Sequence, residues 1–286
     1  MQTIVTGLLL GGLYAMLGIG MSIIFGIMGL TNIAHGNLII LGSFLALTIT
    51  LAFGGHILVG LLLAVVVMVI IGFLLQSSLV NKVIDKGPEP ALLVTFGLSI
   101  IIQNILQLVY GAETYSIKTA ISNKNILSTK YVSISSVYLL NFLAAIAVVV
   151  ILTLIIKRTR LGRAIRAASC SSHNAELMGV NTKLIYSVTM GIAMVSACLA
   201  GVLLGHTFPF YSYSGPQYLI IAFGVVVIGG MGSIAGTLIG GLILGLSQLL
   251  GGYIIGTGYQ ILTGYLVMLV LLTLKPSGLL SGKLSK

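Results

Sequence analysis

The sequence predicts an all-α polytopic integral membrane protein with about eight or nine membrane-spanning segments, at least one of them broken or re-entrant. Its 286 residues are 58% hydrophobic and only 6% charged, with a mean hydropathy of +1.18. Soluble domains carry charge on about a quarter of their residues, so this composition excludes a soluble globular protein. Apolar runs near the roughly 20 residues that a membrane-crossing helix needs recur along the whole chain. We expect one transmembrane domain over residues 1–286.

Eight apolar runs are long enough, or nearly so, to cross a bilayer as helices. The first has no basic region ahead of it and is longer than the core of a signal peptide, which predicts a retained helix. The runs cover residues 4–30, 33–53, 57–75, 91–109, 137–156, 184–206, 234–250 and 259–274. Glycines spaced four apart, such as Gly241 and Gly245, predict helices that pack in close backbone contact.

A ninth apolar run, residues 218–228, is too short to cross alone. Its about 11 residues reach roughly 16 Å as a helix, which is half a bilayer. Gly229, Gly230 and Gly232 follow it, and each glycine weakens a helix by about 1 kcal/mol. Such a break survives at membrane depth only against protein or a water-filled cavity. The segment therefore either crosses in a broken form or dips and returns.

The positions of Lys and Arg predict the orientation. One side collects eleven of them if it holds the connections 80–90 and 157–183 and the tail from Lys275, and the other side keeps only Lys118, Lys124 and Lys130. By the positive-inside rule the first side is the cytoplasm, so the N-terminus lies outside, the C-terminus inside and residues 110–136 form an external loop with room for a hairpin. Because the charges lie in separate loops, they indicate anionic lipid and not nucleic acid as a partner.

The stretch 157–186 is the one long polar interruption with a block of positive charge. Lys157, Arg158, Arg160, Arg163 and Arg166 fall within ten residues. An Arg at the bilayer centre costs about 2.5 to 3.5 kcal/mol, so the block must lie in water or among headgroups. The helix-forming residues between the charges, with Gly179 as a stop, predict a short amphipathic helix beside the membrane. It is either a docking surface for a cytoplasmic partner or a basic loop that only sets topology.

Several kinds of chemistry are missing from the chain. No Asp or Glu lies in the middle of a span, which argues against a carrier driven by protons or sodium. There is no nucleotide-binding loop, no serine-nucleophile motif and no zinc-protease motif, so we expect neither an enzyme nor a cofactor or metal in this chain. Two cysteines, Cys170 and Cys198, give no disulfide or metal framework.

Three polar or glycine-rich breaks are candidates for a substrate path. In the first, Asn32 is positioned to cap the next helix, whose N-terminal amides would then suit a carboxylate; an ordinary turn is the alternative. The second break is a polar group in the fourth span, whose amides could instead form hydrogen bonds between helices. The third is the glycine-rich break after residue 228, whose glycines could instead serve only to pack helices closely. The candidates are Asn32, His35, Gly36 and Asn37; Ser99, Gln103 and Asn104; and Gly229, Gly230, Gly232 and Ser233.

Five stretches spread in order over nearly the whole chain form a set: GLYAMLGIGMSIIFGIMGLTNIAHGNLIILGSF (12–44), TFGLSIIIQN (95–104), RTRLGRAIRAA (158–168), AELMGVNT (175–182) and VIGGMGSIAGTLIGGLILG (227–245). Together they resemble the permease subunits of branched-chain amino acid ABC importers, the LivH-like family. The resemblance implies a permease in a bacterial or archaeal cytoplasmic membrane. Its partners would be a second, similar permease, two cytoplasmic ATPases that hold ATP and Mg, and an external solute-binding protein.

The resemblance also implies that the basic stretch is the segment that couples to the ATPases. The expected coupling residues are Arg160, Arg163, Arg166, Ala167, Ala168, Glu176, Met178 and Gly179. Residues 169–174 lack the acidic side chains that relatives often have there. ATPase closure would push on residues 160–178, tilt the fifth and sixth spans and open a path at the interface with the second permease, with residues 32–37 and 229–236 lining or gating it.

The expected substrates are branched-chain amino acids, chosen largely by the external binding protein. Two alternatives remain open. One is the same architecture carrying urea or short amides. The other is an energy-independent channel for a small neutral solute such as urea, which would need no ATPase.

Overall fold

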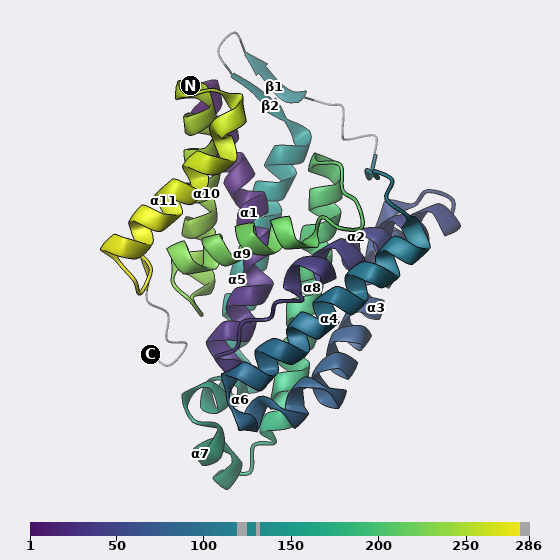
Figure 1. Ribbon diagram of the computed structural model, residues 1–286, viewed down its shortest axis with the longest axis vertical. Coiled ribbons are helices and arrows are strands. Elements are labelled where there is room, and N and C mark those ends of the chain that lie inside the picture. Colours follow the sequence, from purple (N-terminus) through teal and green to yellow (C-terminus); the bar gives the residue numbers. More distant parts are fainter. Residues whose placement is uncertain (119–124, 130–131, 281–286) are drawn as a thin grey trace.

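The computed structural model describes residues 1–118, 125–129 and 132–280, and in this part the protein is a bundle of helices (Figure 1). Eight helices, some together with an adjoining 3-10 turn, are long and apolar enough to cross a membrane. They are α1 (Gln2–Met28), α2 (His35–Ala52), α3 (Ile57–Ser78), α4 (Pro88–Tyr110), α5 (Ser136–Arg158), α8 (Thr182–Thr207), α10 (Ile234–Ile254) and α11 (Gln260–Leu274). The predicted all-α polytopic fold is confirmed.

Shorter elements connect these helices. They are η1 (Val80–Lys82), η2 (Ile84–Lys86), α6 (Arg160–Cys170), α7 (Ser172–Leu177), α9 (Gly215–Gly229), η3 (Thr257–Tyr259) and an antiparallel hairpin of β1 (Asn125–Thr129) and β2 (Val132–Ser135). The hairpin lies within the long connection 110–136. Lys124 and Lys130 of that connection lie outside the described residues.

Helix α1 forms the centre of the bundle. In its most apolar 18 residues 89% are buried, against 17% for α4 and 6% for α11, so α4 and α11 lie on the outside. α1 and α10 run antiparallel in backbone contact: a Cβ at Gly7 would lie 3.0 Å from Leu246 Cα, and one at Gly11 would lie 2.5 Å from Leu242 Cα. Glycine spacing therefore allows the close packing that the sequence predicts.

The bundle has two distinct ends, which we call the hairpin end and the basic end. At the hairpin end the N-terminus meets β2, since Gln2 Nε2 donates to Ser133 O at 2.7 Å (Figure 1). At the opposite, basic end lie α6 and α7. The η1–η2 connection lies there too, because Asn81 Nδ2 donates to Lys183 O at 3.1 Å. The basic loops 80–90 and 157–183 therefore lie at the same end of the bundle and are in contact, which agrees with the prediction that they share one side.

The short helix α9 does not run along the bundle axis but lies across the bundle, at a steep angle to α1 (Figure 1). Its start packs on Gly36, and Val225 in its second half packs on Gly18 near the middle of α1. The chain comes to α9 from the hairpin end, where α8 finishes, and returns to that end through α10. Of the two alternatives left open by the sequence, the segment dips and returns.

Candidate functional site

The start of α2 is recessed into the bundle, next to the middle of α1. Gly29, with φ 66°, ends α1, and residues 29–34 form no helix before α2 begins at His35. The imidazole of His35 is fully buried, and its Nε2 lies 2.9 Å from Leu17 O. A helix N-terminus that faces the interior presents unpaired amides and the positive end of its dipole there.

Asn32 does not cap α2, so this prediction is wrong. The N-cap position is Ala34, and Asn32 Oδ1 accepts a hydrogen bond from Ala34 N at 3.0 Å within the preceding turn. His35 N donates to Asn32 O at 3.1 Å and closes the same turn. Asn32 is buried and stabilises the turn that precedes α2, two residues before the N-cap.

Asn37 joins the start of α2 to the middle of α4. Its Nδ2 donates to both the main-chain oxygen and the hydroxyl of Ser99, each at 2.8 Å. Asn37 Oδ1 has no hydrogen-bond partner among the described residues. Two of the candidate path residues, Asn37 and Ser99, are thus in contact. Gln103 is half-buried further along α4, and Asn104 is exposed and donates to Ile100 O of its own helix, so neither belongs to this contact.

The starts of α2 and α9 touch through two glycines. A Cβ on Gly36 would collide with the main-chain oxygen of Gly215, and a Cβ on Gly215 would collide with Asn37 Oδ1. Because neither residue has a side chain, the two helix starts approach at backbone distance. Asn37 is therefore in contact with α4 and α9 at once.

The predicted glycine break lies at the other end of α9. Gly230 and Gly232 have φ of 104° and 84°, and Ser233 Oγ caps α10 by accepting from Gly236 N at 3.0 Å. The chain after α11 covers the break, since Leu279 N donates to Ile228 O at 2.9 Å and Leu280 N to Gly229 O at 3.0 Å. These bonds satisfy two carbonyls that the end of α9 leaves free.

The predicted breaks at residues 32–37 and 229–233 therefore do not lie next to each other. They lie at opposite ends of α9, whose 15 residues are roughly 20 Å long. The first break contacts the start of α9 and the second forms its end. Both breaks anchor the helix that lies across the bundle.

The basic stretch forms two helices where the sequence predicts one. Thr159 Oγ1 caps α6 by accepting from Gly162 N at 3.0 Å. Ser171 is extended and caps α7 by accepting from Asn174 N at 3.2 Å, so the helix restarts there. Gly179, with φ 81°, ends the segment as predicted. Ser171 therefore divides the basic stretch into α6 and α7. One serine among several polar residues gives no sign of this division in the sequence.

The predicted coupling residues fall on two faces. Arg160, Arg163 and Ala167 are exposed, whereas Ala168 is buried and Arg166 donates from Nη1 to Ile156 O of α5. Arg166 and Ala168 thus fix α6 to the bundle. At the tip of α7, Leu177 is 74% and Met178 85% exposed. Glu176 accepts a hydrogen bond from Thr182 Oγ1, which ties this tip to the start of α8.

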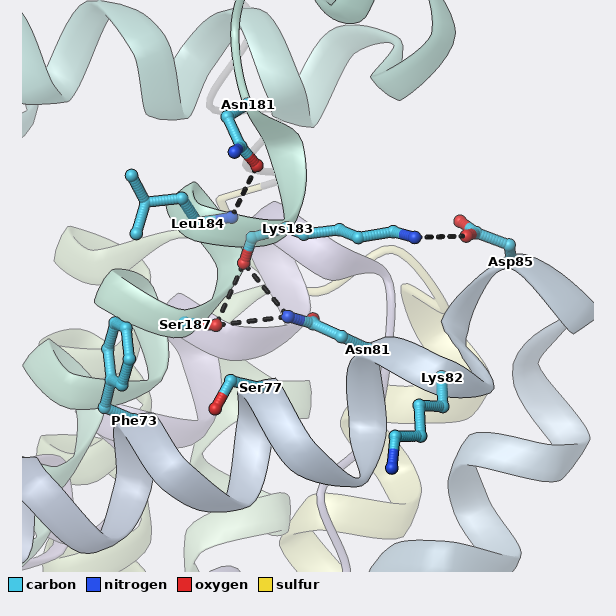
Figure 2. Close-up of a pocket in the computed structure, with 9 residues that line it drawn as sticks. All are labelled: Phe73, Ser77, Asn81, Lys82, Asp85, Asn181, Lys183, Leu184 and Ser187. Atoms are coloured by element: carbon cyan, nitrogen blue, oxygen red, sulfur yellow. Dashed lines mark hydrogen bonds and ion pairs between the residues drawn. The ribbon is translucent and has the colours of Figure 1, made fainter.

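A groove of about 520 Å³ lies beside this segment, between the end of α3, η1, η2 and the start of α8 (Figure 2). Figure 2 shows Asn81 pointing at Lys183 O and the Ser187 hydroxyl, each 3.1 Å from its Nδ2. Lys183 Nζ lies 4.0 Å from Asp85 Oδ2, with both side chains mostly exposed, so this ion pair adds little stability. Sequence reasoning missed the groove because its walls come from distant parts of the chain.

A second cavity, of about 430 Å³, is lined partly by residues near the hairpin end, such as Tyr138, and was also missed. We call it the tyrosine cavity. Its polar lining consists of four tyrosines and three glutamines: Tyr14, Tyr138, Tyr211, Tyr218, Gln217, Gln248 and Gln260. The one signal in the sequence is Gln248, a long polar side chain inside an apolar run. Among the described residues, no group of three His, Cys, Asp or Glu side chains is close enough to share a metal ion.

Comparison with known proteins gives one family and several relatives. Residues 3–274 match the family described as branched-chain amino acid transport system / permease component. The chain is 30% identical to the high-affinity branched-chain amino acid transport system permease protein LivH of Escherichia coli K12, with 98% of this chain and 95% of that protein covered. It is 31% identical to BraD of Pseudomonas aeruginosa, with the same coverage. The match extends from α1 to the end of α11.

A more distant relative comes from an archaeon. The chain is 24% identical to the probable branched-chain amino acid transport permease protein LivH of Methanocaldococcus jannaschii, with 93% of this chain and 88% of that protein covered. The family match over residues 3–274 includes α6, α7 and α9 as well as the long helices.

Proposed function

The chain belongs to the family of branched-chain amino acid transport system permease components, and from this premise we propose that it is the transmembrane permease subunit of an ATP-driven importer of branched-chain amino acids. It is a multi-pass membrane protein. In this proposal its own part is passive, because ATP and Mg would be bound and ATP hydrolysed by two cytoplasmic ATPase subunits.

The observation that carries the proposal is the rigid junction between α6 and α5. A Cβ on Gly162 would collide with the main-chain oxygen of Ile156, so α6 sits directly on the end of α5. Arg166 adds a hydrogen bond to the same oxygen. A push on α6 therefore moves α5 and does not merely bend a loop.

Helix α5 then carries this movement to the hairpin end. Its 23 residues are roughly 34 Å long, which is enough to cross a bilayer. At Gly12 a Cβ would lie 2.5 Å from Phe142 Cα, so α5 and α1 are in backbone contact. Tyr138, near the start of α5, lines the tyrosine cavity. Force applied at the basic end thus reaches the wall of a cavity at the hairpin end.

The docking face for an ATPase subunit is the exposed side of α6 and α7. Arg160 and Arg163 offer positive charge, and Leu177 and Met178 form an exposed apolar tip. A large apolar pair exposed beside charged residues is typical of an interaction surface. On the opposite side of α6, the buried Ala168 and the hydrogen bond of Arg166 attach this helix to the bundle. Glu176 attaches the tip of α7 to the start of α8.

In this proposal the basic end faces the cytoplasm, and the N-terminus and the hairpin face the outside. The concentration of Lys and Arg at the basic end supports this orientation through the positive-inside rule. The external solute-binding protein would then meet the hairpin end, and anionic lipid headgroups would surround the basic loops. A second permease subunit completes the path, and α9 with its two anchored ends is the element that closes it.

Reconstitution tests the function. Proteoliposomes would contain this chain, its partner permease and two ATPase subunits, with the solute-binding protein added at the hairpin side. We expect uptake of labelled leucine, isoleucine and valine that needs ATP on the α6 side. Uptake without ATPase subunits would favour the energy-independent channel, and uptake of urea in preference to leucine would favour the alternative substrate class.

A further inference from the structure

We infer that the tyrosine cavity is the site at which this subunit holds the transported solute, and that the solute is an uncharged or zwitterionic molecule with an aliphatic side chain. The inference rests on the proposed transport function and names the residues that the solute touches. The cavity volume of about 430 Å³ lies within the range of small-molecule sites.

The cavity reaches from the hairpin end to the middle of the bundle. Tyr138 lies near the start of α5, whereas Tyr14 lies midway along α1. Helix α9, which crosses the bundle, forms its floor with Tyr218 and Ile221. Beyond α9, the glycine contacts at both of its ends leave no room for side chains. A solute in the cavity would therefore lie against α9 through Tyr218 and Ile221.

The polar lining has both donors and acceptors to offer. Tyr14 Oη donates to Gln248 Oε1 at 2.6 Å, and both residues are at least 94% buried. Gln248 Nε2 has no hydrogen-bond partner among the described residues. A buried amide N–H without a partner is unfavourable, and a solute carboxylate or carbonyl would satisfy it. The lone pairs of Tyr14 Oη and the faces of the tyrosine rings suit an ammonium group.

The wall between α10 and α11 is built from two glutamines that lie on glycines. Gln248 of α10 packs on Gly264, where a Cβ would lie 2.5 Å from its Cγ, and Gln260 of α11 packs on Gly252. Both amides are held at the cavity wall by this packing. Amide side chains inside a helix bundle bond neighbouring helices or face a solute path, and Gln248 Nε2 bonds to no neighbour among the described residues.

Charge and apolar surface narrow the class of solute. No Asp, Glu, Lys or Arg lines the cavity, so a solute with a charged side chain would find no counter-ion. Leu10, Ile221 and Leu249 supply apolar surface beside the amides. A molecule with a polar head and an aliphatic tail matches this lining.

The test uses Gln248→Met, which keeps the length of the side chain over Gly264 but removes the amide. Its matched control is Gln107→Met on the exposed face of α4. In the reconstituted complex described above, we expect the KM for leucine uptake to rise about tenfold in Gln248→Met and to stay unchanged in Gln107→Met. ATP hydrolysis without solute should match the unaltered complex in Gln107→Met, and co-elution of all subunits in size-exclusion chromatography reports whether Gln248→Met assembles.

A second arm measures access to the cavity. With Cys170→Ser and Cys198→Ala as background, Gln217→Cys is labelled with a neutral maleimide, and Tyr253→Cys, 78% exposed and outside the cavity, is the control. Leucine should slow labelling at position 217 only, and glutamate and lysine should not.

Different results would overturn the proposed transport function and the proposed solute site. No ATP-dependent leucine uptake by the unaltered complex would overturn the proposed function, whatever the labelling shows. Normal uptake with an unchanged KM in Gln248→Met would overturn the site and leave the function standing. Failure of Gln248→Met to co-elute with the other subunits, shared by Tyr14→Phe, would mean that the hydrogen-bonded pair only stabilises the fold, and would overturn the site as well.

Discussion

His35 Nε2 lies 2.9 Å from the main-chain oxygen of Leu17, so the first residue of α2 is bonded to the middle of α1. A carbonyl oxygen only accepts hydrogen bonds, so the imidazole donates from Nε2. Nδ1 has no partner among the described residues. One buried side chain therefore holds the start of α2 against the middle of α1.

From this bond we expect His35→Leu to destabilise the protein. The bond ties two helices together, and its loss leaves Leu17 O and the recessed helix start less well satisfied, which should cost about 1 to 3 kcal/mol. The measurement is the temperature at which half the detergent-solubilised protein is lost from a size-exclusion peak. His206→Leu is the control: its Nδ1 lies 2.7 Å from Val202 O of its own helix, so we expect a smaller loss.

The double variant Arg160→Glu/Arg163→Glu should insert normally but lose ATP-coupled uptake. Both side chains are exposed on α6, so reversing their charge changes the docking face and not the interior. Copurification of the ATPase subunits and leucine uptake are the measurements. Lys275→Glu, a reversal outside α6 and α7, is the control. Full uptake by the double variant would rule out docking through α6.

Arg166→Ala should behave differently from that pair. Because the Arg166 guanidinium bonds to Ile156 O of α5, its loss loosens α6 from α5 and leaves the exposed face unchanged. We expect the ATPases to bind and hydrolyse ATP while leucine transported per ATP falls about threefold or more. Measuring hydrolysis and uptake in the same vesicles gives this ratio. An unchanged ratio would mean that α6 does not transmit force through this contact.

Gly230→Ala should reduce the amount of folded protein. Its φ of 104° is unfavourable for any residue with a Cβ, and that Cβ would collide with Leu280 O. We expect a loss of more than about 1 kcal/mol, with faster proteolysis after α11 because residues 279–280 no longer pair with α9. Gly97→Ala is the control, since no atom lies within 4 Å of that Cβ. Full stability with impaired uptake would instead give Gly230 a direct role in the path.

Sequence reasoning found the spans because their signal is local. The run 137–156 corresponds to α5 (Ser136–Arg158), and the half-length run 218–228 to α9 (Gly215–Gly229), each within three residues. Inside a membrane a long apolar run forms a helix, because only a helix satisfies all of its backbone hydrogen bonds within the segment. For the same reason, the break after α9 follows directly from its glycines.

What the sequence did not reveal depends on contacts between distant residues. Nothing near His35 indicates that its helix starts beside Leu17, and nothing near Gly215 indicates that α9 turns across the bundle. The tyrosine cavity joins Tyr14 to Gln248, 234 positions apart. Asn32 has the right residue type for a cap, but the turn that closes on Ala34 places the cap two residues later. The path and coupling assignments stay predictions until transport is measured.

The central position of α1 has a consequence for how the protein is made. α1 is synthesised before α10, yet its glycine face packs on α10, which follows more than 200 residues later. Its other partners, α5, α8 and α9, also follow it in the chain. During biosynthesis the glycine face of α1 therefore stays in contact with lipid or the insertion machinery until α10 has been translated. The packing of α1 is thus completed late, and chains truncated before Ile234 lack the helix that covers its glycine face.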